Sequence, residues 1–82
     1  MTTHETEFNG WKNWETYNVA ESLTTNYPLY CIAQGYTRYR TPYLSLRADL
    51  AKTFNFLKTK DGADLWDSAL DIEALDDMLR EL

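Results

Sequence analysis

The chain has few cysteines and no long apolar run. Its only cysteine, Cys31, cannot form an internal disulfide, which favours a reducing compartment such as the cytoplasm. Because Cys31 lies in the apolar stretch YPLYCIA, we expect it to be a small buried hydrophobic residue. No stretch approaches the roughly 18 to 20 apolar residues of a membrane span, and the N-terminus MTTHETEF lacks the features of a signal peptide. These absences predict a soluble, cytoplasmic protein that does not bind membranes.

Residue patterns that carry catalysis or hold metals are also missing. The chain has a single histidine, His4, and contains no glycine-rich phosphate loop, no paired Cys/His spacing and no Ser/His/Asp set. Asp61, Asp64 and Asp67 recur at every third position, but a calcium loop needs alternating oxygen ligands and a late glutamate, so we expect a solvated acidic face. The sequence therefore predicts no catalytic residue, metal ligand or cofactor, and no enzymatic activity.

Aromatic and aliphatic residues, by contrast, are plentiful. Of the 82 residues, 44% are hydrophobic and 15% aromatic, which suffices for one packed core, while the length is too short for two domains. Residues 1–8 are polar and show no periodicity, so we expect a disordered tail there and a single domain over residues 9–82. Alternation with a period of two is sustained nowhere. The prediction is an all-α fold of three to four helices, with an α+β fold as the minor alternative.

Start and stop signals place the first two helices. Asn13 is a suitable N-cap for a helix over residues 14–25, with Glu15 favourably placed in its first turn. Asn26 is a suitable N-cap for a second, short helix that Gly35 ends.

Two further helices are expected in the second half of the chain. Thr41-Pro42 repeats the start signal, and one continuous apolar stripe is predicted to follow it along the third helix: Tyr43, Leu46, Leu50, Phe54 and Leu57. Asp71 is expected to cap a last, acidic helix. The residues before it are predicted to form a turn anchored by Leu65 and Trp66.

The motif NGWKNWETYNV, residues 9–19, is the most unusual stretch of the chain. At 100° per residue, one face of the first helix is an ordinary core stripe of Thr16, Val19, Ala20 and Leu23. A second face combines aromatic and polar residues, with Trp11 one turn upstream: Trp14, Tyr17, Asn18 and Glu21. This face either closes over the helices as a lid or forms a contact surface for a partner, because Trp and Tyr are enriched in interface hot spots.

Basic and acidic residues are concentrated in different parts of the chain, which suggests a second possible function. Residues 36–60 carry six basic residues against one acidic residue, whereas residues 61–82 carry eight acidic residues against one basic residue. Within the basic part, Arg38, Tyr39 and Arg40 interleave cations with an aromatic ring, as single-stranded nucleic-acid sites do. The acidic helix could instead imitate the phosphate row of DNA. The net charge of −5 argues against general nucleic-acid binding.

The opening motif also resembles that of a family of short uncharacterised proteins of tailed phages, cyanobacterial phages among them, and of some bacteria. Their members open with N-G-[W/F]-x-N-x-E-T-[W/Y]-N-V and close with an acidic helix similar to LDIEALDDMLREL. Glu21 and Ser22 stand where that family has an apolar pair that includes Trp. The resemblance implies a phage or phage-like origin and a host-cytoplasm setting, and it implies no activity.

These observations lead to one principal hypothesis and two alternatives. The principal hypothesis is a non-enzymatic protein-binding module, a phage accessory protein that engages a host protein through Trp11, Trp14, Tyr17, Asn18 and Glu21. One alternative is an effector of host nucleic-acid machinery that acts through Arg38, Tyr39 and Arg40 or as a DNA mimic. The other is a purely structural role as a homo-oligomer.

Overall fold

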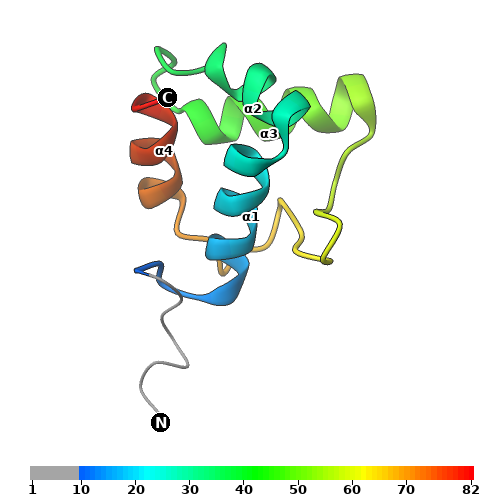
Figure 1. Ribbon diagram of the computed structural model, residues 1–82, viewed down its shortest axis with the longest axis vertical. Coiled ribbons are helices and arrows are strands. Elements are labelled where there is room, and N and C mark those ends of the chain that lie inside the picture. The colour runs from blue at the N-terminus through cyan, green and yellow to red at the C-terminus, as the bar shows by residue number, and fades with distance from the viewer. Residues whose placement is uncertain (1–9) are drawn as a thin grey trace, which may run out of the picture.

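The structure, a computed structural model, describes residues 10–82, so the tail expected over residues 1–8 lies outside the described residues. Four helices follow one another: α1 (Trp14–Thr25), α2 (Tyr27–Gln34), α3 (Pro42–Phe54) and α4 (Ile72–Arg80) (Figure 1). Residues 10–82 contain no strand, and Lys58 and Asp64 form an isolated antiparallel bridge. The predicted all-α fold is confirmed, and the α+β alternative is excluded for these residues.

Local capping explains where three of the helices begin. Asn13, Asn26 and Asp71 each accept a hydrogen bond from the backbone N–H three residues later, at 2.9, 3.3 and 3.2 Å. Each bond satisfies one of the amides that the first turn of a helix leaves unpaired. These three predicted caps are therefore confirmed, and α1 spans the predicted residues 14–25. Thr41 stands at the start of α3 as predicted, but its side chain makes no cap bond.

The helices pack around one core to which the irregular segment 55–71 also contributes. Helix α1 contacts both α2 and α4, and α3 contacts α4. In Figure 1 the segment 55–71 descends from the end of α3 on the right and returns at the level of the first turn of α1 to the start of α4. The buried hydrophobic residues are Val19, Ala20, Leu23, Ala33, Tyr43, Leu46, Leu50, Ala63, Leu65, Leu70, Leu75 and Leu79. The predicted core stripe of α1 is confirmed, since Thr16 is buried beside its three apolar members.

The third helix is shorter than its predicted apolar stripe. It ends at Phe54 because Asn55 adopts a left-handed conformation (φ 54°), and the Asn55 N–H bonds back to the last turn. Phe54 and Leu57 are 59% and 45% exposed, whereas Phe56 is half-buried and packs against the core. The prediction of one continuous stripe along the helix as far as Leu57 was therefore wrong.

Two other expected core residues lie at the surface. Cys31 is exposed on α2, where Ala33 is the only buried residue, so the prediction of a buried cysteine was wrong. Trp66 is 46% exposed and does not anchor its turn, although its neighbour Leu65 is buried as predicted. The Trp66 indole lies instead over the guanidinium of Arg47, whose Cζ is 4.1 Å from the ring centroid.

Candidate protein-binding groove

The structure divides the aromatic and polar face of α1 into an inner and an outer part. Trp11, Trp14 and Tyr17 are half-buried, and both indoles pack against the core. Asn18 is only 4% exposed, whereas Glu21 is exposed. The aromatic residues thus serve in part as the lid considered from the sequence, and only part of the predicted contact face reaches the surface.

Asn18 holds the segment 58–64 against α1. Its Oδ1 accepts a 2.5 Å hydrogen bond from the hydroxyl of Thr59, and its Nδ2 donates a 3.0 Å bond to the carboxylate of Asp61. The Thr59 hydroxyl in turn accepts from the backbone N–H of Ala63 at 3.0 Å. Because buried polar groups need partners, this network fixes the turn that carries Ala63 into the core. Asn18 is thereby removed from the surface available to a partner.

The N-terminus of α1 fastens the chain just before α4 in a similar way. Beyond capping α1, Asn13 donates through Nδ2 to the backbone oxygen of Ala69 at 2.7 Å. The buried hydroxyl of Thr16 donates to Asn13 Oδ1 at 2.6 Å and accepts from the backbone N–H of Asp71 at 3.0 Å. Three polar residues of the opening motif, Asn13, Thr16 and Asn18, therefore tether a segment 41 to 56 residues away.

The acidic repeat of the same segment shapes turns. Asp64 and Asp67 each accept a 2.9 Å hydrogen bond from the backbone N–H two residues later, the pattern of Asx-turns. Asp61 is exposed but accepts from Asn18. The expectation of a merely solvated face is corrected accordingly. Within residues 10–82 there is no group of three or more His, Cys, Asp or Glu side chains placed to hold a metal ion.

The surface around Trp11 forms a shallow groove between α1 and α4. Two adjoining hollows share Trp11 and Met78 as a common wall. The first has a volume of about 390 Å³ and is lined by Gly10, Trp11, Ala74, Asp77, Met78 and Glu81. The second is lined by Trp11, Tyr17, Ala20, Glu21, Thr24 and Met78. We refer to the two hollows together as the Trp11–Met78 groove. Its floor is apolar, and its position beside α4 could not be derived from the motif alone.

Carboxylates form the rim of the groove. Glu21 on α1, Asp77 on α4 and Glu81 after α4 are all exposed. Asp77 forms a 3.2 Å ion pair with Arg80, which is the one ion pair among residues 10–82 and is itself exposed. The rim is therefore acidic, which favours a partner that brings positive charge together with apolar side chains.

The residues of the nucleic-acid alternative lie on the turn between α2 and α3. Arg38, Tyr39 and Arg40 are all exposed, and none of them lines the groove. The Tyr39 ring lies 4.9 Å from that of Tyr36, whose hydroxyl donates to the carboxylate of Asp49. The backbone oxygen of Arg40 accepts from Arg80 at 2.9 Å, so the turn is held while its two arginine side chains reach solvent.

Comparison with family models, with curated proteins and with solved structures finds no match to this chain. The resemblance of the opening motif to short phage proteins therefore stays a prediction. Among residues 10–82, no helix combines the length and the apolar character needed to cross a bilayer.

Proposed function

We propose that the chain is a non-enzymatic protein-binding module whose contact surface is the Trp11–Met78 groove. The observation that carries the proposal is an apolar groove with an acidic rim, built from the part of the unusual motif that reaches the surface. Tethering explains Asn13, Thr16 and Asn18, but it does not explain the half-exposed Trp11 or the exposed Glu21 beside it. The partner segment fitting such a groove presents an apolar side chain between lysines or arginines.

The resemblance to phage proteins supports a partner in the host cytoplasm, where a small accessory protein would bind and modulate a host protein. Groove and partner would meet through few residues, because each of the two hollows has only six lining residues. An interface of that size belongs to the weak and transient class.

Affinity capture from a bacterial lysate tests this proposal with charge-matched variants. Glu21→Lys changes the rim, whereas Glu73→Lys changes an equally exposed acid on α4 that does not line the groove. Proteins that are recovered by the wild type and by Glu73→Lys, but lost with Glu21→Lys, are groove partners, and each is then titrated as a purified protein. Equal recovery by all three proteins would eliminate the groove as the contact surface. Circular dichroism confirms that the variants remain folded.

A second candidate function, single-stranded nucleic-acid binding, is favoured by the exposure of Arg38, Tyr39 and Arg40 on one held turn. Binding to a fluorescent single-stranded oligonucleotide should then be detectable at low salt and weaken as salt rises. Arg38→Ala/Arg40→Ala should abolish it, and an absence of binding by the wild type at low salt would remove this candidate.

The DNA-mimic alternative has less support than protein binding or single-stranded nucleic-acid binding. Asp71 and Asp76 both accept hydrogen bonds from backbone amides at helix starts, at 3.2 and 2.8 Å. Asp76 is only 9% exposed. These two carboxylates are therefore not part of any row of surface charges that could imitate phosphates.

A further inference from the structure

We propose that, when no other partner is present, the Trp11–Met78 groove binds a second copy of this chain through its basic apolar segment. This segment, residues 52–58, displays the exposed side chains Lys52, Phe54, Leu57 and Lys58. The inference rests on the proposed function, because it uses the same groove and the same partner chemistry. It goes beyond that function by naming an occupant.

The basic apolar segment has the composition that the groove requires. Phe54, the last residue of α3, and Leu57, which follows the left-handed Asn55, are 59% and 45% exposed. Lys52 and Lys58 lie on either side of them, and neither forms an ion pair within residues 10–82. Exposed apolar side chains grouped in this way mark contact surfaces more often than isolated ones do.

Charge complementarity selects the orientation of the contact. Glu21 and Glu81 on the groove rim are exposed carboxylates, and Lys52 and Lys58 are exposed ammonium groups. Each copy of the chain carries a net charge of −5, so the overall electrostatic repulsion between two copies opposes association. Only the local pairing of the groove with the segment favours it. The N-terminal segment of the same chain is a poorer occupant, since Glu5 and Glu7 would bring negative charge to an acidic rim.

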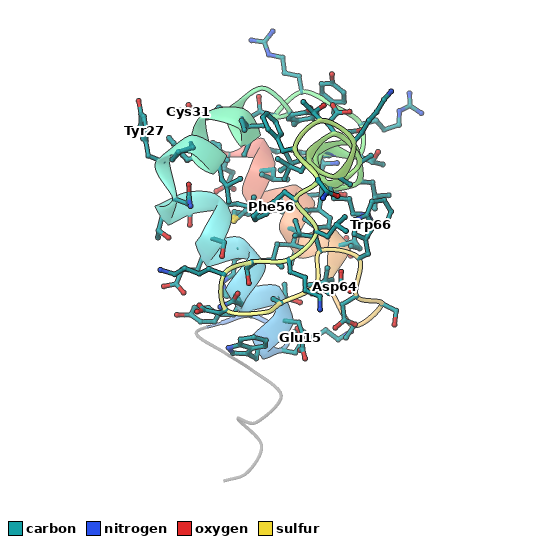
Figure 2. All side chains as sticks on the ribbon, turned by 90° about the vertical axis from the view of Figure 1, so that its right-hand side faces the viewer. Glu15, Tyr27, Cys31, Phe56, Asp64 and Trp66 are labelled. Carbon is teal, nitrogen blue, oxygen red and sulfur yellow. The ribbon has the colours of Figure 1, made fainter. Side chains whose placement is uncertain are left out.

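The basic apolar segment and α4, which forms one wall of the groove, lie on opposite sides of the molecule. In Figure 1, α4 is on the left and the chain leaving α3 is on the right; Figure 2, turned by 90°, shows that chain toward the viewer and α4 behind it. One copy therefore cannot place its own segment in its own groove. The contact is head-to-tail, and each added copy leaves one groove and one segment open, so assemblies grow with concentration.

Sedimentation velocity on the full chain, from micromolar to millimolar concentration, tests this inference. The wild type should associate at low ionic strength and dissociate as salt rises. A groove variant, Glu21→Lys/Glu81→Lys, and a segment variant, Lys52→Glu/Lys58→Glu, should each weaken association by at least about tenfold. Arg38→Glu/Arg40→Glu makes the same charge change as the segment variant at exposed sites elsewhere, and it should associate as the wild type does.

Mixing the two variants provides the decisive measurement. The groove variant keeps an intact segment and the segment variant keeps an intact groove, and the two reversed surfaces are also opposite in charge, so an equimolar mixture should associate although neither variant does so alone. A wild type that stays monomeric throughout, or association that both variants leave unchanged, overturns the inference.

The failure of this inference is distinguishable from that of the proposed function. The probe is a synthetic helical peptide of leucines and lysines with its leucines on one face, compared with its leucine and glutamate counterpart. If the wild type is monomeric and binds the lysine peptide, and Glu21→Lys does not bind it, the proposed function is supported and the self-association is rejected. A monomer that binds neither peptide contradicts both.

Discussion

The carboxylate of Asp76 on α4 caps helix α3: its Oδ1 accepts a 2.8 Å hydrogen bond from the backbone N–H of Tyr43. Thr41, at the N-cap position, makes no cap bond with its own side chain. The cap is thus supplied by a residue 33 positions away, and it joins α3 to α4 where they pack together. Asp76 is almost buried, and the positive end of the α3 dipole favours its charge there.

Removal of this cap should destabilise the whole domain. We expect Asp76→Ala to lower the free energy of unfolding by about 1–2 kcal/mol, because it leaves a first-turn amide of α3 without its partner. Asp76→Asn keeps an acceptor oxygen but loses the charge, so it should cost less. Urea unfolding followed by circular dichroism measures both, with Thr41→Ala as the control. If Asp76→Ala costs no more than Thr41→Ala, the cap has no energetic role.

The buried amide of Asn18 should control the stability of the segment 58–64. Asn18→Ala leaves the hydroxyl of Thr59 without its acceptor, and we expect a loss of about 1–3 kcal/mol. Hydrogen exchange at the amide of Ala63, which bonds to that hydroxyl, should accelerate more than exchange in α3. Gln34→Ala, which removes an exposed amide on α2, is the control and should change neither quantity. Unchanged protection at Ala63 would refute the tethering role.

Two tyrosines should make the fold sensitive to alkali. Burial, together with the hydrogen bond to Asp49, raises the pKa of Tyr36 to about 12, and burial raises the pKa of Tyr43 above its ordinary value. Both groups are neutral when protonated, so above pH of about 10 the unfolded chain releases protons that the folded chain retains. The stabilisation is therefore complete below that pH and declines as pH rises toward 12. Titration of the tyrosine absorbance in folded and urea-unfolded protein measures the difference.

Tyr43→Phe separates the two contributions to this effect. The variant loses the 2.7 Å hydrogen bond from the Tyr43 hydroxyl to the backbone oxygen of Leu65, which should cost about 1 kcal/mol at neutral pH. The decline of stability above pH of about 10 should become shallower, because one titrating group is gone. A decline as steep as that of the wild type would assign the alkaline sensitivity to other groups.

The stacking of Trp66 on Arg47 should be measurable as a coupling energy. A double-mutant cycle with Arg47→Met and Trp66→Leu should give about 0.5–1 kcal/mol, as expected for a cation–π pair at a partly exposed site. Arg47 also donates from Nη1 to the backbone oxygen of Leu65 at 3.4 Å and lies 5.8 Å from the Tyr43 ring, so Arg47→Met alone should cost more than the coupling energy, and only the cycle isolates the Trp66 contact. A coupling energy indistinguishable from zero would show that the contact contributes nothing to stability.

Capping residues allowed most helix starts to be predicted, whereas the candidate site could be predicted only in part. Asn13, Asn26 and Asp71 accept from amides three residues away, so their capping role can be predicted from neighbouring residues in the sequence. Trp11 and Glu21 were placed at the surface of the candidate site, but Met78 was not, because nothing in the sequence indicates that α4 lies beside Trp11. The apolar period of α3 continues in the sequence beyond the end of the helix, because a hydrophobic pattern does not indicate that Asn55 adopts a left-handed conformation.

The sequence by itself determined the order of the helices and the core stripe of α1, because periodicity and caps are local properties. Only the tertiary structure decided what the polar residues of the opening motif do. Asn18 finds its partners 41 and 43 residues away, and Asp76 caps a helix that precedes its own. Such partners depend on how the chain folds back on itself. The same long-range packing leaves Phe54 and Leu57 exposed and places an acidic groove on the opposite side of the molecule.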